Sequence, residues 1–141
     1  MYKFRYCLTM WVSFAILFNL SVLGLEILEG NKITTTEYYG LQNIGIIFIG
    51  MIFLTTSFLY PVTLLPLTWL IRKWVKSPTI RIAFYTLLGG LCGMFIFRFL
   101  YDDYFVRGYD LQISTSIVIF SFFGLVYALI DQFSPLKAAD K

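Results

Sequence analysis

The sequence predicts an all-α membrane protein, a bundle of four transmembrane helices. Of the 141 residues, 59% are hydrophobic and 13% are charged, against about 25% charged residues in an average soluble domain. The mean hydropathy is +0.78, and the apolar residues form four long runs. The length suits one domain, which we expect to cover residues 1–141.

The four apolar runs have the length of membrane spans. A helix needs about 20 apolar residues to cross a hydrocarbon layer roughly 30 Å thick. The predicted spans are residues 7–25, 41–60, 82–100 and 111–130. Because these runs do not alternate between apolar and polar residues, they do not indicate barrel strands. No small-residue cleavage site follows the first run, so we expect it to remain as a helix and not to act as a signal peptide.

Charge placement predicts the orientation. Both termini and the connection after the second span carry eight of the 11 basic residues: Lys3, Arg5, Arg72, Lys73, Lys76, Arg81, Lys137 and Lys141. The other two connections carry six acids: Glu26, Glu29, Glu37, Asp102, Asp103 and Asp110. Because basic loops stay on the cytoplasmic side, we expect both termini in the cytoplasm and this multi-pass protein in the cell membrane. We interpret the acidic connections as solvated outer loops.

The region after the second span is apolar but contains Pro61 and Pro66. One helix over residues 41–71 would be about 46 Å long, which exceeds the hydrocarbon thickness. Proline removes a backbone donor and kinks or ends a helix. We therefore expect a break near Pro61 and a separate short helix over residues 62–76 at the inner membrane face, where its tryptophans and basic residues contact lipid headgroups.

Aromatic residues also cluster at the predicted membrane boundaries. We interpret all of them as anchors at headgroup depth: Trp69 and Trp74 on the inner side, and Tyr38, Tyr39, Tyr101, Tyr104 and Tyr109 on the outer side.

Arg98 is the ionisable residue inside a predicted span, which makes it a candidate for function. It lies near the outer end of that span, so its side chain can reach the headgroups. Asp102 follows four residues later and is expected to pair with it on one helix face. Two interpretations remain open: a membrane anchor, or a site for an anion or a partner at the outer mouth.

Three further residues are candidates for contacts between helices. Asn19 is an amide within the first span and is expected to hydrogen-bond across the bundle. Gly89 and Gly93 form a small-x-x-x-small pair on the third span, which favours close helix packing, and we expect that contact within one chain.

The sequence lacks the residues that several classes of chemistry require. There is no histidine, and Cys7 and Cys92 are too far apart for a C-x-x-C motif. We therefore predict no catalytic set, no metal site and no cofactor. The first span also contains no acid, whereas small multidrug-resistance transporters depend on a buried carboxylate in their first helix.

The segments MYKFRY, PVTLLPLTW and FGLVYALID, together with the layout of the spans, resemble small four-helix membrane protein families of Gram-positive bacteria. These families have no assigned reaction, so the resemblance implies no site residues. It implies a bacterial protein of the same four-helix layout.

The function expected from these observations is non-enzymatic. We expect an accessory, regulatory or protective membrane protein that acts through membrane lipids, another membrane protein or a second copy of itself, and that binds no nucleic acid. The alternative is a small oligomeric transporter or channel. This alternative rests on the hydroxyl residues of the fourth span and on Arg98. It also rests on the prolines after the second span, since irregular backbone can line a cavity.

Overall fold

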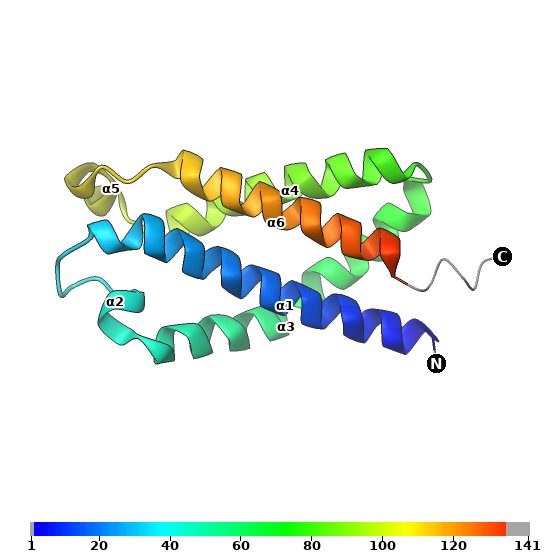
Figure 1. The fold of residues 1–141 in the computed structure, drawn as a ribbon, viewed down its shortest axis with the longest axis horizontal. Helices are drawn as coiled ribbons and strands as arrows, with labels where there is room; N and C mark the ends of the chain where they lie inside the picture. The colour runs from blue at the N-terminus through cyan, green and yellow to red at the C-terminus, as the bar shows by residue number, and fades with distance from the viewer. Residues whose placement is uncertain (1, 135–141) are drawn as a thin grey trace.

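The computed structural model describes residues 2–134, and every regular element in this range is helical (Figure 1). The long helices are α1 (Tyr2–Leu28), α3 (Ile46–Trp74), α4 (Pro78–Leu100) and α6 (Ile113–Phe133). The short elements are η1 (Gly30–Lys32), α2 (Leu41–Ile44) and α5 (Asp103–Tyr109). All four long helices are long and apolar enough to cross a membrane, which confirms the prediction of an all-α chain with four candidate spans. The predicted basic residues Lys137 and Lys141 lie outside the described residues.

The predicted break near Pro61 is wrong. One helix, α3, contains both Pro61 and Pro66, and no separate helix exists over residues 62–76. Pro61 has no N–H to offer the carbonyl of Ser57, but the indole of Trp11 on α1 donates to that oxygen at 3.2 Å. A neighbouring helix therefore satisfies the group that the proline leaves free, and the helix continues.

The interruption of the second apolar run lies at its start instead. Gly45 has φ 64°, a backbone conformation that favours glycine, and it separates α2 from α3. At the other end, α3 stops at Trp74, and α4 begins four residues later at Pro78. Proline is well tolerated at this first position of a helix.

The Trp11–Ser57 contact can be tested by a double-mutant cycle. In the natural sequence, Trp11→Phe is expected to lower the free energy of unfolding by about 0.5–1.5 kcal/mol beyond its packing loss, because the Ser57 carbonyl loses its donor. In a Pro61→Ala background the restored backbone N–H donates to the Ser57 carbonyl, so Trp11→Phe is expected to lower the free energy of unfolding by less. Equal costs of Trp11→Phe in the two backgrounds, measured by unfolding in detergent micelles, would contradict this explanation.

The bundle is built from two helix pairs that meet along α1 and α6. α1 packs against α3 on one side and α6 on the other, and α4 makes its most extensive contact with α6 (Figure 1). Where α1 meets α6, the core contains tilted and edge-on rings of Phe14, Phe18, Phe120 and Phe123. We call these four residues the aromatic layer. It lies midway along the helices and separates the polar residues of one end from those of the other.

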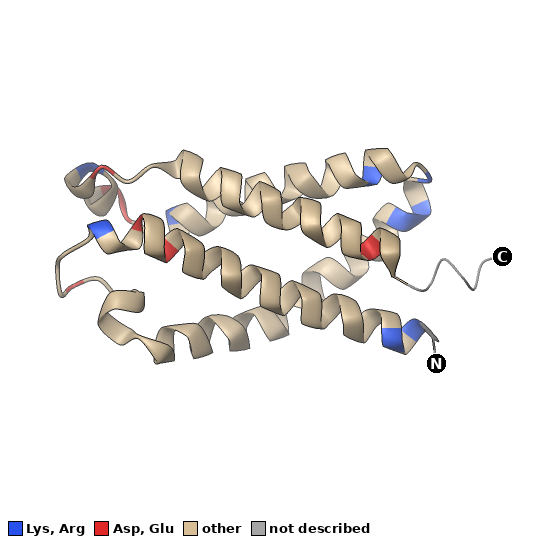
Figure 2. Cartoon of the chain, viewed as in Figure 1, with Lys and Arg blue, Asp and Glu red and all other residues tan. Residues whose placement is uncertain are grey.

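Charged residues gather at the two ends of the molecule and leave the middle of the long helices uncharged (Figure 2). One end holds the chain start, the α3–α4 connection and the end of α6. The opposite end holds η1, α2 and α5. This distribution is typical of a protein whose central zone lies in hydrocarbon.

Candidate functional site

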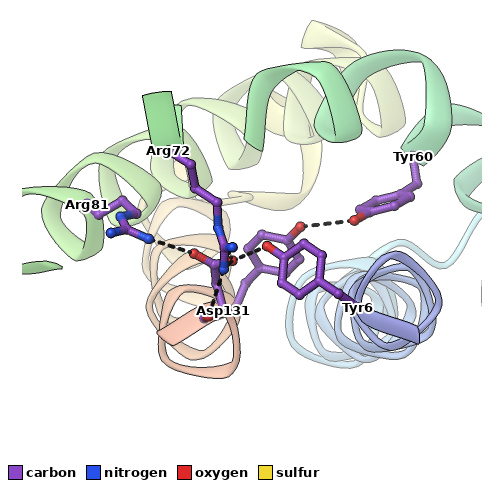
Figure 3. Close-up of polar contacts among 6 residues, drawn as sticks. Tyr6, Tyr60, Arg72, Arg81 and Asp131 are labelled. Carbon is purple, nitrogen blue, oxygen red and sulfur yellow. Dashed lines mark hydrogen bonds and ion pairs between the residues drawn. The ribbon is translucent and has the colours of Figure 1, made fainter. Parts of the chain in front are cut away.

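One buried carboxylate connects the long helices at the end where the chain starts. Asp131 lies in the last turn of α6 and is only 1% exposed. Its Oδ1 accepts hydrogen bonds from Arg72 of α3, with Nη2 at 2.7 Å and Nε at 3.2 Å. Its Oδ2 lies 3.5 Å from Nη1 of Arg81, which is in the first turn of α4. Figure 3 shows both arginines converging on Asp131.

Tyr6 brings α1 to the same carboxylate. Its hydroxyl donates a short hydrogen bond to Oδ1 of Asp131. The guanidinium of Arg72 lies over the Tyr6 ring, 4.3 Å from its centroid, in a cation–π contact (Figure 3). Each of the four long helices thus contributes one side chain, and we call Tyr6, Arg72, Arg81 and Asp131 the Asp131 cluster.

The Asp131 cluster carries two cations and one anion. The guanidinium groups remain partly accessible, with side chains of Arg72 and Arg81 exposed by 27% and 18%. A buried carboxylate is costly unless it is paired and hydrogen-bonded. Tyr6 and the two arginines offset this cost, and they come from three other helices. The cost is therefore offset only when all four helices adopt one arrangement. The cluster therefore specifies how the helices assemble at this end.

A second layer of polar residues lies one helical turn deeper. Thr68, Tyr85 and Tyr127 each stand four residues from a charged member of the cluster, on α3, α4 and α6, and all three are buried. We call them the hydroxyl layer. The hydroxyl of Tyr127 donates to that of Tyr60 at 3.4 Å, which extends the polar contacts towards Phe14 of the aromatic layer.

The opposite end of the bundle contains a second buried carboxylate. Glu26 of α1 is 1% exposed, and its Oε1 accepts hydrogen bonds from the hydroxyls of Tyr38 and Tyr101, the latter at 2.8 Å. The two tyrosine rings stack with centroids 5.8 Å apart. Burial raises the pKa of both tyrosines, as does the neighbouring Glu26, so both hydroxyls stay protonated and act as donors.

Glu29, the residue that follows the end of α1, contacts the start of α6. Its Oε1 accepts from Thr115 at 2.7 Å, and its Oε2 accepts from the backbone N–H of Gln112 at 3.1 Å and from Lys32 at 2.9 Å. The two glutamates are therefore structural residues of the bundle, and the interpretation of this region as a solvated acidic loop is wrong for both.

The role of Glu26 as an acceptor leads to a specific expectation. Glu26→Gln keeps an oxygen for the two tyrosines, whereas Glu26→Leu leaves two buried hydroxyls unpaired. We expect the free energy of unfolding of Glu26→Leu to be about 1–3 kcal/mol lower than that of Glu26→Gln. The same two substitutions at exposed Glu37 serve as the control. If Glu26→Gln destabilised the bundle as much as Glu26→Leu, the negative charge and not the acceptor would be the required feature.

The sequence candidates occupy other places. Arg98 is exposed, and α4 ends at Leu100, while Asp102 lies just before the first residue of the following helix α5. The two residues are not on one helix, and no ion pair joins them within residues 2–134, so their predicted pairing is wrong.

The predicted role of Asn19 is also wrong. Its Nδ2 donates to the carbonyl of Ala15 on its own helix at 2.8 Å, because the side chain folds back along α1. Its Oδ1 is buried without a partner among the described residues.

Gly89 and Gly93 lie where α4 approaches α6 most closely. A Cβ on Gly89 would overlap the carbonyl oxygen of Phe120, and one on Gly93 would come within 2.7 Å of the carbonyl oxygen of Ser116. The Ser116 hydroxyl in turn donates to the carbonyl of Gly93 at 2.7 Å. The small residues thus face a helix of the same chain.

The sequence does not predict the Asp131 cluster, because Arg72 and Arg81 fall in a predicted connection and Asp131 lies just outside the last predicted span. Tyr38 and Tyr101, taken as membrane anchors, are instead buried donors to Glu26. One sequence signal was available: Arg72, Arg81 and Asp131 each have a hydroxyl residue four positions closer to the middle of the same helix. That spacing places a charge and a hydroxyl on one helix face.

The sequence matches no protein-family model, and neither a curated protein nor a solved structure is significantly similar to the chain. The candidate residues therefore rest on the geometry of this chain, and no role is carried over from a relative.

Proposed function

We propose that this chain is a bacterial, multi-pass protein of the cytoplasmic membrane with both termini on the cytoplasmic side, and that it acts without catalysis as an accessory or regulatory partner of other membrane components. The orientation rests on charge. The end of the bundle that holds the Asp131 cluster also carries the exposed basic residues Lys3, Arg5, Lys73 and Lys76. Cytoplasmic flanks of membrane helices are enriched in such residues.

One observation supports action through contact more than any other. α3 packs mainly against α1 and turns a long apolar face outward, with Ile46, Phe58 and Val62 exposed by 82%, 77% and 75%. Three of its polar residues, Thr56, Tyr60 and Thr68, are buried against the bundle. In a membrane the outward face meets lipid tails or the helix of another protein, and that face is the largest surface that α3 offers.

The inner end of α3 suits the headgroup region. Trp69 and Trp74 are both exposed, and the ammonium of Lys73 lies over the Trp69 ring, 5.4 Å from its centroid. Indole rings and basic side chains at the end of a span are typical of contact with anionic headgroups. We therefore include membrane lipids, another membrane protein and a second copy of the chain among the proposed partners.

Native mass spectrometry of the protein, extracted gently from its own membrane without overexpression, tests the proposal. We expect the chain to leave the membrane with a reproducible companion protein at fixed stoichiometry. As a control, α3 variants Phe58→Ser and Val62→Ser are expected to lose the companion, whereas Phe99→Ser on α4, also highly exposed, is expected to retain it. A chain that leaves the membrane with neither a companion protein nor a second copy would contradict action through a protein partner, and a homo-oligomer without a companion would favour the transporter described next.

A small oligomeric transporter remains the second candidate, and the Asp131 cluster is the observation that favours it. Buried charged residues inside a membrane bundle often mark a substrate or proton path. The aromatic layer argues against a path through one chain, because Phe14, Phe18, Phe120 and Phe123 close the space between the two ends. Solute or proton flux in liposomes that carry the purified homo-oligomer, abolished by Asp131→Asn, would support transport.

A further inference from the structure

The hydroxyl of Thr68 lacks the hydrogen bond that most buried helical hydroxyls of this chain make. Seven serines and threonines donate to the carbonyl four residues earlier on their own helix: Thr9, Ser21, Thr55, Thr56, Ser57, Thr63 and Thr86. This is the usual way in which such residues satisfy their hydroxyl inside a helix. Thr68 is only 4% exposed, yet its Oγ1 makes no hydrogen bond of this kind and has no partner among the described residues.

Three more buried polar atoms without partners lie in the same region. They are the hydroxyl of Tyr85, the Oδ2 of Asp131 and the Nε of Arg81. Arg81 and Tyr85 stand one turn apart on α4, Thr68 stands one turn before Arg72 on α3, and Oδ2 is the atom that lies 3.5 Å from Arg81 Nη1.

The chemistry of these four atoms defines what can bind them. Oδ2 of Asp131 only accepts, Nε of Arg81 only donates, and the hydroxyls of Thr68 and Tyr85 do both. A bound anion would be repelled by Oδ2, and a bound cation would be repelled by the guanidinium. Water donates and accepts at once, and a buried water makes about three hydrogen bonds to such groups. Without such a partner, each of these buried atoms loses the hydrogen bond that it makes with water in the unfolded chain.

We propose that Thr68, Arg81, Tyr85 and Asp131 form an internal binding site for water between the Asp131 cluster and the hydroxyl layer. Water enters from the end of the bundle where Arg72 and Arg81 are partly exposed. The aromatic layer closes the site towards the other end, so that water reaches into the bundle from one side of the membrane only. This hydration supports the buried charges and does not depend on the accessory role proposed above.

Cysteine accessibility in the full chain tests the site. In a Cys7→Ala, Cys92→Ala background, single cysteines are placed at Thr68 and at Thr56, two buried threonines of α3. The matched control, Thr56, satisfies its hydroxyl on the Ile52 carbonyl at 2.6 Å and is expected to be dry. In native membranes, N-ethylmaleimide is expected to react about tenfold or more faster with Thr68→Cys, because thiols ionise only where water reaches them. Equal rates in folded protein would overturn the proposal.

A second measurement needs no variant. A structure of the natural chain in lipid at a resolution that shows ordered water is expected to place at least one water within hydrogen-bond distance of three of the four atoms. A structure in which Tyr85 and Thr68 bond directly to Asp131, with no water between them, would overturn the proposal whatever the labelling rates.

Discussion

Asp131→Ala is expected to be the most destabilising single change in the chain. It leaves Arg72 and Arg81 facing each other at the end of the bundle and removes the acceptor of the Tyr6 hydroxyl. Removing one partner of a buried ion pair typically costs about 3–5 kcal/mol, because the remaining charge is uncompensated. Thermal or denaturant unfolding in micelles, followed by tryptophan fluorescence, measures the loss.

Two comparisons separate charge from general damage. Asp103→Ala removes a carboxylate that is exposed outside the bundle and is expected to change stability by less than about 0.5 kcal/mol. The triple variant Arg72→Met, Arg81→Met, Asp131→Leu is expected to recover much of the lost stability, since well-packed apolar residues can replace a buried ion network. Similar unfolding midpoints for Asp131→Ala and Asp103→Ala would show that Asp131 does not hold the helices together.

Gly89→Ala is expected to push α4 and α6 apart. The added Cβ would overlap the carbonyl oxygen of Phe120, a backbone atom that cannot rotate away, and it would also crowd Gly124. Overpacking of this kind usually costs about 1–3 kcal/mol, and it acts on the most extensive helix contact in the molecule. The unfolding midpoint in micelles measures the effect.

The matched control lies on α3. A Cβ on Gly50 would meet nothing within 4 Å, so Gly50→Ala is expected to be neutral or to stabilise the helix by about 0.5–1 kcal/mol. The two substitutions change the same atoms and differ only in what surrounds them. If both had the same effect, the close contact between α4 and α6 would not be a determinant of stability.

The spans could be predicted because hydrocarbon imposes a simple requirement on sequence. Apolar runs of about 20 residues are best accommodated in hydrocarbon, and residues 82–100 and 111–130 agree closely with α4 and α6. The ends of the spans were less predictable. α1 continues to Leu28 beyond the predicted end because Glu26 and Glu29 are buried by tyrosine, threonine and backbone donors.

The remaining errors share one physical cause, which is tertiary contact between distant residues. Whether Pro61 ends a helix depends on Trp11, which lies 50 residues earlier. Whether Asp131 is a solvated flank or a buried centre depends on arginines from two other helices. Arg98 and Asn19 are polar residues that interrupt the apolar runs. The charged residues that hold the helices together lie just outside those runs, and they are Glu26, Arg72, Arg81 and Asp131.

The sidedness of labelling in intact cells tests most directly the claim that four helices cross the membrane and hold the Asp131 cluster at the cytoplasmic side. In a Cys7→Ala, Cys92→Ala background, Glu37→Cys, Lys76→Cys and Arg107→Cys place single thiols on exposed positions of the three connections. A membrane-impermeant maleimide is expected to label positions 37 and 107 in intact cells, and position 76 only after the membrane is opened. Labelling of position 76 in intact cells, with positions 37 and 107 protected, would reverse the orientation, and labelling of all three would contradict the four spans.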